Sequence, residues 1–472
     1  DITFTSDAGR IFSIVVLLSG VIFLLVMLPF TFIQFFYAPW LEAQSKTRVP
    51  RSIPEETFDH VIITAFDPIT IALVHAFKKY HHKYVIIVPD VQQALYLLDQ
   101  GYRIMVGDLD DPATFRRARA DKAALVVALN DDMKNTNLVY TVREVAPTIP
   151  IAANADMEDS VDILHLAGCT HVFQFMNMLG RSLARRTLGA SMRSNVIGRF
   201  ETLLIAEAPI MRTGLVGKTL RESGLREETG ITVVGLWDRG RFRIPLPETI
   251  INSTTVLVLA GSEEQLAAYD DFVGDIEAPP SAPVLILGGG RVGKAAAAAL
   301  RESGMEYVVV EKNPKMIKEE KYSVTGSAAD YDTLVRAGIN KAPSVFITTH
   351  NDDLNIYLTI YCRRLRPDIQ IISRATLDRN ITILHSAGAD LVMSHSSMAA
   401  NTIINLLSPG KVLMLTEGLN IFRVPIHSSL EKKSLVASGI RERTGCSAIA
   451  VIRNARSRSI PTPICRSMPA TK

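Results

Sequence analysis

The sequence has few cysteines and no pair of them at metal-binding spacing. Cys169, Cys362, Cys446 and Cys465 stand far apart in a chain of 472 residues. Their separation excludes a zinc site and a disulfide framework, and it predicts reduced thiols in a reducing compartment. The net charge of +3, with acids and bases interspersed, also lacks the concentrated basic face that nucleic-acid binding requires.

Charge is absent from one long segment. Between Ile11 and Trp40 there are 30 consecutive positions without Asp, Glu, Lys or Arg, most of them Ile, Val, Leu, Phe or Met. Roughly 20 apolar residues in a helix span a bilayer core, so this segment predicts a transmembrane helix. Tyr37 and Trp40 would lie in the aromatic belt, and the bases Lys46 and Arg48 place the following part in the cytoplasm. A buried core helix is the alternative, but such helices are rarely apolar on every face.

Two residues weaken this apolar helix locally. Gly20 lies near the middle of the span and Pro29 lies deeper. Both residue types weaken a helix locally and favour bending, so Gly20 is a candidate hinge. The alternative for Gly20 is a small residue that lets helices pack closely.

The rest of the chain is a duplication with a period of about 220 residues. Three ordered matches support it: Gly107–Asp111 with Gly326–Asp330, Asn130-Asp131-Asp132 with Asn351-Asp352-Asp353, and Ile163–Gly168 with Ile383–Gly388. The last match repeats a histidine, His165 and His385, within a helical pattern, which indicates packing or capping.

Each copy alternates short apolar runs with helical patterns. In the second copy the expected strands are Val284–Leu287, Tyr307–Val310, Val345–Thr348 and Ile369–Ile372, and the expected helices include Lys294–Ser303 and Leu354–Arg364. This alternation is typical of a parallel, doubly wound α/β sheet. A smaller segment follows each copy.

The expected fold class is therefore α/β: one transmembrane helix followed by two tandem Rossmann-like domains, each with a small α+β accessory lobe. The expected parts are the helix at 1–41, a linker at 42–57, the first Rossmann-like lobe at 58–195, its accessory lobe at 196–279, the second Rossmann-like lobe at 280–411 and its accessory lobe at 412–472. From Ala455 the sequence is rich in Arg, Ser and Pro, and no last strand is expected there.

A glycine fingerprint follows the first strand of the second copy. It reads Gly288-Gly289-Gly290-Arg291-Val292-Gly293 and opens an alanine-rich helix. Gly288 permits the tight turn, Gly290 lets the backbone approach a pyrophosphate, and Gly293 allows close helix packing. Glu311 lies 18 residues beyond Gly293, where an acid binds ribose hydroxyls, so NAD is favoured over a 2′-phosphorylated cofactor. The alternative is a turn kept for packing alone, and ATP or ADP remain open as ligands.

The first copy lacks this fingerprint. Its corresponding turn is Ala65–Thr70, which contains no glycine. Asp67 would repel a pyrophosphate, Pro68 removes an N–H donor, and Val88 stands where the second copy has Glu311. Dinucleotide binding is therefore not expected in the first copy.

The first copy is instead rich in carboxylates at predicted strand ends. They are Asp108, Asp110, Asp111, Asp131, Asp132, Asp156, Glu158 and Asp159. Oxygen ligands of this kind suit Ca²⁺. A solvated acidic rim is the alternative.

Together these features resemble prokaryotic potassium channels with tandem RCK domains. Asp1 matches the acid that follows the signature glycine of the filter, Gly9-Arg10 matches the start of the pore-lining inner helix, and Leu215–Leu220 resembles the lobe after an RCK nucleotide fold. The resemblance implies that Arg291 contacts a phosphate and that Ser327 and Arg374 line the adenosine side. It also implies calcium ligands at Asp132, Asn154 and Asp156, with Asn154 replacing an acid.

The resemblance further implies a ligand-gated, homotetrameric potassium channel in the cytoplasmic (inner) membrane, with Gly20 as the gating hinge of its inner helix. Two RCK units in each of four subunits would form a cytoplasmic gating ring of eight. The alternative is a peripheral, NAD-binding regulatory subunit of a potassium-uptake transporter, although such subunits lack a membrane helix. An enzyme is not expected, because the residues around the fingerprint supply no acid/base pair for hydride transfer.

Overall fold

The computed structural model describes residues 6–37, 40, 48–188, 194–200, 203–210, 213–238, 241–252, 255–274, 282–317, 320–407, 412–416 and shorter stretches up to 459. The described residues fall into two compact units. One lies within Asp1–Phe66, His82–Ala153 and Asp162–His171, and the other within Asp67–His81, Asn154–Val161 and Val172–Lys472.

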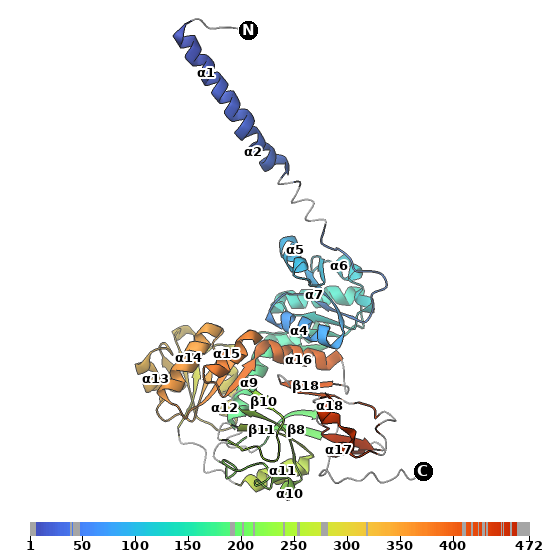
Figure 1. Ribbon diagram of the computed structural model, residues 1–472, viewed down its shortest axis with the longest axis vertical. Coiled ribbons are helices and arrows are strands. Elements are labelled where there is room, and N and C mark those ends of the chain that lie inside the picture. The colour runs from blue at the N-terminus through green and yellow to red at the C-terminus, as the bar shows by residue number, and fades with distance from the viewer. Residues whose placement is uncertain are drawn as a thin grey trace. The chain divides into compact units, whose positions relative to one another are not determined.

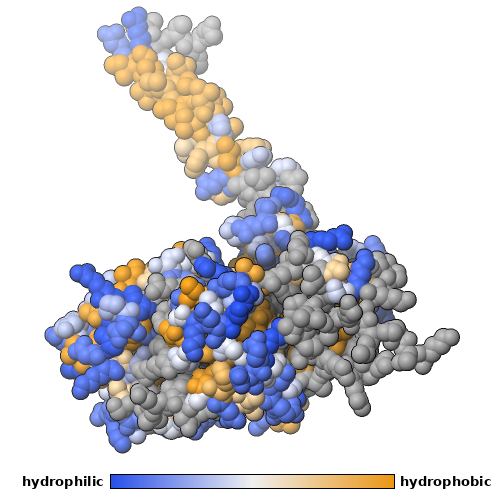
Figure 2. Space-filling model, turned by 60° about the horizontal axis from the view of Figure 1, so that its bottom comes forward, coloured by the Kyte–Doolittle hydropathy of each residue, from blue (hydrophilic) through white to orange (hydrophobic). Residues whose placement is uncertain are grey.

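The apolar N-terminal segment is helical from Asp7 to Tyr37 and is long and apolar enough to cross a membrane. It comprises α1 (Asp7–Ile22), the π-helical turn η1 (Phe23–Met27), α2 (Leu28–Phe32) and a second π-helical turn, η2 (Ile33–Tyr37). Ser6 caps its start by accepting a hydrogen bond from the N–H of Gly9 at 3.2 Å. Its side chains are solvent-exposed in the isolated chain, and Figure 2 shows their apolar surface. An exposed apolar surface of this length suits a lipid surrounding.

The helix departs from α-helical bonding around Pro29, not at Gly20. Gly20 lies inside the regular helix α1, whereas the π-helical turns η1 and η2 lie on either side of α2, which contains Pro29. Proline has no N–H to donate and disturbs the preceding turn, which accounts for the wider turn before it. The hinge at Gly20 stays a prediction. Asp1 and Lys46 lie outside the described residues.

The first Rossmann-like sheet has six strands in the order β3-β2-β1-β4-β5-β6. Its strands are β1 (His60–Ile63), β2 (Lys83–Val88), β3 (Ile104–Val106), β4 (Leu125–Ala128), β5 (Ile151–Asn154) and β6 (His171–Phe173). Adjacent strands among β1 to β5 are parallel. The residues of β1 to β5 are almost wholly apolar and buried, as expected when helices cover both faces, whereas those of β6 are only partly buried.

The second Rossmann-like sheet repeats this topology, with the order β14-β13-β12-β15-β16-β17 and parallel pairing throughout. Its strands are β12 (Val284–Leu287), β13 (Tyr307–Glu311), β14 (Ser323–Thr325), β15 (Ser344–Ile347), β16 (Gln370–Ala375) and β17 (Leu391–Ser394). The expected doubly wound sheet is confirmed. The chain reverses its direction of strand addition between β12 and β15, and ligands bind at such switch points.

Helices connect the strands in both repeats. In the first they are α4 (Pro68–Tyr80), α5 (Val91–Asp99), α6 (Pro112–Arg117), α7 (Asp132–Val145), α8 (Asp159–Leu166) and α9 (Phe175–Leu188). In the second they are α12 (Arg291–Glu302), α13 (Tyr331–Ala337), α14 (Asp352–Leu365), α15 (Ile381–Ser386) and α16 (His395–Leu407). Short 3₁₀ turns occupy 120–122, 314–316, 320–322 and 378–380.

A small lobe follows each repeat. The first contains an antiparallel sheet with the strand order β10-β9-β11-β8-β7. Its strands are β7 (Asn195–Phe200), β8 (Leu203–Pro209), β9 (Thr232–Asp238), β10 (Arg241–Arg243) and β11 (Thr255–Gly261). Two helices, α10 (Leu225–Thr229) and α11 (Glu263–Val273), complete this lobe. The described parts of the second are the strand pairs β18 (Val412–Thr416) with β19 (Leu419–Phe422) and β20 (Ala450–Arg453) with β21 (Arg456–Ser459), and the helices α17 (Leu435–Ser438) and α18 (Ile440–Thr444). β21 lies after Ala455 and pairs with β20. The expected lack of a last strand concerns the residues after 459, which lie outside the described residues.

Helices of the two repeats pack against each other. The last helix of the first repeat, α9, lies along α12 of the second (Figure 1), and Leu179 and Leu183 share a core with Val292 and Leu300. A Cβ atom added to Gly180 would lie 2.4 Å from the carbonyl oxygen of Val292, so the two helix backbones are in close contact there. In the same way, α16 of the second repeat packs against α4 of the first.

The helix starts correct one of the repeat matches. Asp131 and Asn351 are the N-cap residues of α7 and α14, and they accept hydrogen bonds from the N–H groups of Lys134 and Leu354. Asp131 therefore corresponds to Asn351, and Asp132 to Asp352. The sequence match of Asn130-Asp131-Asp132 with Asn351-Asp352-Asp353 is therefore wrong by one residue. The two segments read alike, but the helix begins after the second residue of the first segment and after the first residue of the second.

Candidate nucleotide-binding site

The glycine turn of the second repeat has a backbone that requires glycine at two positions. Gly288 has a φ of +114°, and a Cβ atom on Gly293 would lie 1.9 Å from the carbonyl oxygen of Gly288. Thr348, which follows β15, donates its hydroxyl hydrogen bond to the same carbonyl at 2.9 Å. The turn is thus held tightly between β12 and α12, as a phosphate-binding turn at a switch point requires.

The N-terminus of α12 is open at the centre of this turn. Gly290 is its N-cap residue and supplies no side-chain hydrogen bond to the helix. No other group lies within 4 Å of a Cβ atom built on Gly290. The unpaired N–H groups of the first helical turn favour an anion at such a place.

Glu311 lies at the end of β13, beside the glycine turn. Its Oε2 accepts a hydrogen bond from the N–H of Gly289 at 2.6 Å, and its Oε1 accepts one from Asn313 at 2.9 Å. Ser327 follows the neighbouring strand β14, and its hydroxyl accepts a hydrogen bond from the N–H of Ala329 at 3.3 Å. Both side chains therefore lie at the carboxyl edge of the sheet.

Basic side chains gather at the same edge. Arg374, at the end of β16, is only 6% exposed, and within the described residues its Nε atom has no hydrogen-bond partner. Burial lowers the pKa of Arg374, with Asp352 opposing that effect and Arg291 adding to it. A buried guanidinium with an unsatisfied N–H is a group that an anionic ligand stabilises.

His395, the first residue of α16, belongs to this basic group although the sequence did not single it out. It is 8% exposed, and burial, followed by the charges of Arg374 and Arg291, lowers its pKa to about 4. Its ring contacts Phe175 edge to face, with the centroids 6.4 Å apart. Only its place after the last parallel strand, β17, pointed to the site in the sequence.

The corresponding turn of the first repeat is closed by its own side chain. Asp67 is the N-cap residue of α4 and accepts a hydrogen bond from the N–H of Thr70 at 2.8 Å. Burial raises the pKa of Asp67, although the hydrogen bonds from Thr70 oppose this. A carboxylate thus occupies the place that a ligand phosphate would take at a helix N-terminus.

The predicted calcium ligands do not assemble into a recognisable cage. No cluster of three or more His, Cys, Asp or Glu suitable for a metal occurs among the described residues. Asn154 donates a hydrogen bond from Nδ2 to Asp156 at 3.2 Å, and its Oδ1 accepts one from Phe175. Asp352, the counterpart of Asp132, is occupied by the N–H groups of Thr376 and Leu377 and by Asn380. That position has a structural role in the second repeat, and calcium binding stays an untested prediction.

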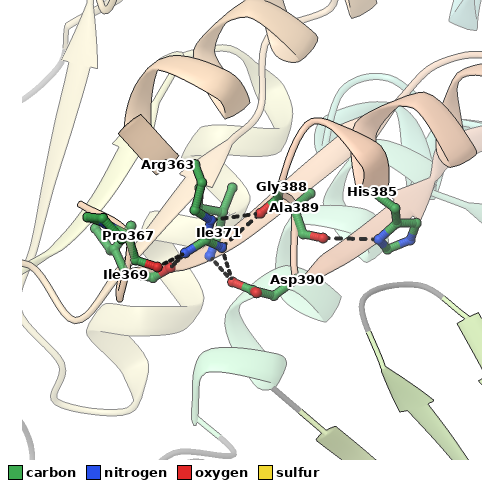
Figure 3. Close-up of polar contacts among 8 residues, drawn as sticks. All are labelled: Arg363, Pro367, Ile369, Ile371, His385, Gly388, Ala389 and Asp390. Carbon is green, nitrogen blue, oxygen red and sulfur yellow. Dashed lines mark hydrogen bonds and ion pairs between the residues drawn. The ribbon is translucent and has the colours of Figure 1, made fainter. Parts of the chain in front are cut away.

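The repeated histidine belongs to a structural motif. In the second repeat Arg363 donates hydrogen bonds to the carbonyl oxygens of Pro367, Ile369 and Gly388 and forms an ion pair with Asp390 at 2.8 Å (Figure 3). His385 contacts the carbonyl oxygen of Ala389 at 3.1 Å through Nδ1. In the first repeat Arg143, Thr170 and His165 make the corresponding contacts. The predicted packing or capping role of these histidines is confirmed.

Two of the described cysteines, Cys169 and Cys362, are buried. Cys169, Cys362 and Cys446 are free thiols, in agreement with the sequence. Burial raises the pKa of Cys169 to about 11 and that of Cys362 to about 12, so both remain protonated and unreactive at neutral pH.

Comparison with known proteins identifies the repeats. The TrkA-N domain family matches residues 61–175 and 284–395, and the TrkA-C domain family matches residues 205–274. The solved structure of the GsuK channel is 36% identical, with a TM-score of 0.69, and the match covers 98% of this chain and 84% of that one. The chain belongs to the RCK-gated potassium channels.

Other comparisons agree with this assignment. The GsuK channel bound to NAD is 35% identical to this RCK protein, with a TM-score of 0.67 and coverage of 98% and 84%. Potassium channel protein 1 of Methanocaldococcus jannaschii is 28% identical over 193 residues, 38% of this chain and 58% of that protein. A Trk system potassium uptake protein TrkA homolog of Pyrococcus abyssi is 30% identical over 161 residues, 31% of this chain and 71% of that protein. The chain thus spans little more than half the length of the archaeal channel.

Proposed function

We propose that this chain is a subunit of a ligand-gated potassium channel of the cytoplasmic membrane and that its second RCK repeat binds a dinucleotide, NAD. One observation carries the nucleotide site: the open N-terminus of α12 at Gly290 lies in a glycine turn beside Glu311. The first repeat, with the same fold, fills that place with Asp67. The solved GsuK channel bound to NAD supports the ligand class.

In the proposed complex the pyrophosphate lies over Gly290, with Arg291 as its cationic partner. Glu311 accepts hydrogen bonds from the ribose hydroxyls in place of the N–H of Gly289. A carboxylate here disfavours a 2′-phosphate through charge repulsion. Ser327 and Arg374 line the adenosine side.

Binding opens or closes the pore only if the ligand prefers one conformation of the cytoplasmic assembly. The apolar helix 7–37 would then be the inner helix of the pore, in a homotetramer with a gating ring of eight RCK units. Calcium sensing by the first repeat is not needed for this proposal.

The test is titration calorimetry with NAD on the purified chain and on Gly290→Asp and Glu311→Ala. Gly290→Asp places a carboxylate where the pyrophosphate would lie, in a position with room for it, so folding is retained and NAD affinity falls more than tenfold. Glu311→Ala removes hydrogen bonds to a charged acceptor, each worth about 1.5–3 kcal/mol, and weakens NAD binding roughly tenfold or more.

Gly214→Asp is the matched control, because it also places a carboxylate on a glycine with free space around it: a Cβ atom built on Gly214 would have no other group within 4 Å. Gly214 lies in the accessory lobe, away from the glycine turn. Its NAD affinity should equal that of the parent. Equal affinity in all four proteins would refute the site.

A regulatory subunit of a potassium-uptake system is the second candidate, supported by the similarity to the TrkA homolog of Pyrococcus abyssi. Potassium flux into liposomes that contain the full-length protein with its pore, with and without NAD, separates the two. A selective flux that responds to NAD supports the channel. Absence of flux from folded, inserted protein supports the regulatory subunit.

A further inference from the structure

An acidic side chain of the first repeat reaches the glycine turn of the second. Asp156, in the loop between β5 and α8, forms an ion pair with Arg291, the first residue of α12. The two residues are 135 positions apart in the sequence (291 minus 156). Asn154 donates a hydrogen bond to the Oδ1 atom of Asp156 at 3.2 Å, which orients the carboxylate.

The helix pair α9–α12 holds this loop in place. The N–H of Ala155 donates to the carbonyl oxygen of Phe173 at 2.8 Å, which ties the loop to the strand that leads into α9. Arg181 of α9 then forms a two-pronged ion pair with Glu302 of α12, at 2.7 and 2.9 Å. The loop of the first repeat is therefore presented to the N-terminus of α12 by packed and ion-paired elements, not by a chance surface contact.

Arg291 is the charged residue of the phosphate-binding fingerprint. A guanidinium recognises carboxylates and phosphates with the same pair of parallel N–H groups, so one group excludes the other from that edge. The pair with Asp156 is partly exposed, with 52% and 37% of the two side chains accessible. Ion pairs of this exposure are weak, and a doubly charged pyrophosphate at a helix N-terminus can displace them.

We propose that Asp156 is an internal competitor for the phosphate-binding side chain of Arg291, and that a dinucleotide pyrophosphate releases it. This inference rests on the proposed function, since it concerns the same site. Nucleotide occupancy of the second repeat would thereby be transmitted to the loop 154–158 of the first repeat. The ion pair between Asp156 and Arg291 also lowers the affinity for the dinucleotide, because the ligand must break it before Arg291 can bind a phosphate.

The first measurement is calorimetric titration of the full chain with NAD and with adenosine, which has no phosphate. Asp156→Asn keeps the shape and the hydrogen bond from Asn154 but removes the charge. It should tighten NAD binding about two- to fivefold, the factor that corresponds to a partly exposed ion pair, and leave adenosine binding unchanged. Glu158→Gln, which neutralises an exposed carboxylate in the same loop, is the matched control and should leave NAD binding unchanged.

The double variant Asp156→Asn/Arg291→Gln separates competition from a general charge effect. If Asp156 acts through Arg291, Asp156→Asn has no effect on NAD affinity in the Arg291→Gln background. An equal effect in both backgrounds would mean simple repulsion and would overturn the proposal. Hydrogen exchange of residues 154–158 should also increase when NAD binds.

The outcomes distinguish this inference from the proposed function. Absence of NAD binding by the parent chain refutes both. NAD binding that Asp156→Asn leaves unchanged or weakens, with melting temperatures alike, refutes the competitor role alone.

Discussion

His395 should make the stability of the RCK portion of the chain depend on pH. Its ring is 8% exposed, packs against Phe175 and lies near two guanidinium groups, those of Arg374 and Arg291. Burial, then these charges, lower its pKa from the ordinary 6.5 to about 4, while Asp156 opposes the shift. The folded protein therefore keeps His395 neutral in a pH range in which the unfolded chain protonates it.

The direction of this pH dependence follows from the number of protons that each state binds. Because the folded-state pKa is the lower one, the unfolded state binds more protons, and stability falls as the pH drops below 6.5 and through the folded value near 4. The stability is fully present above pH 6.5. One pKa unit corresponds to about 1.4 kcal/mol, so His395 should remove about 3 kcal/mol of unfolding free energy between pH 7.5 and pH 4.

The assay is urea denaturation of the detergent-solubilised chain, followed by the fluorescence of Trp237 in a Trp40→Phe background, since the chain has 2 tryptophans. His395→Gln should flatten the pH dependence of the unfolding free energy by about 3 kcal/mol relative to the parent. His350→Gln, at an exposed histidine, is the control and should leave it unchanged. Parallel pH curves for the parent and His395→Gln would refute the assigned burial of this ring.

Two further predictions concern paired charges and use the same denaturation assay. The side chains of the ion pair between Arg186 and Glu207 are only 9% and 3% exposed. Glu207→Ala should therefore lower the unfolding free energy by about 3–5 kcal/mol, because it leaves a buried cation, while the double variant Arg186→Met/Glu207→Leu should lower it far less. Equal losses in the two variants would contradict the argument that the unpaired buried charge is the cause. Arg363→Lys should lower the unfolding free energy by about 3 kcal/mol, because an ammonium group cannot reach all the carbonyl oxygens that the guanidinium binds in Figure 3. Asp390→Thr, which introduces the residue type of Thr170 in the first repeat, should lower it by only about 1 kcal/mol. A larger loss for Asp390→Thr than for Arg363→Lys would show that the charge of Asp390, and not the several N–H groups of Arg363, fixes the loop.

Local sequence was sufficient for the sheets and for the glycine turn. The strand Val284–Leu287 and the turn Gly288–Gly293 have the predicted places, because burial on both faces requires continuous apolar runs and the turn requires glycine. The sequence predicted the first residues of helices less well. The expected helix at Lys294 begins at Arg291, since the first helical turn is made of residues that also read as a loop.

Sequence by itself therefore determined the apolar helix, the duplication, the two doubly wound sheets and the loss of the fingerprint from the first repeat. These depend on periodicity and on residue types at neighbouring positions. The tertiary structure alone decided that His395 joins the basic group, that Asp352 fastens a loop, and that Asp156 reaches Arg291. Each of these depends on which elements of a duplicated chain pack together, and packing between helices such as α9 and α12 is fixed by the close contact at Gly180, which local sequence patterns do not encode.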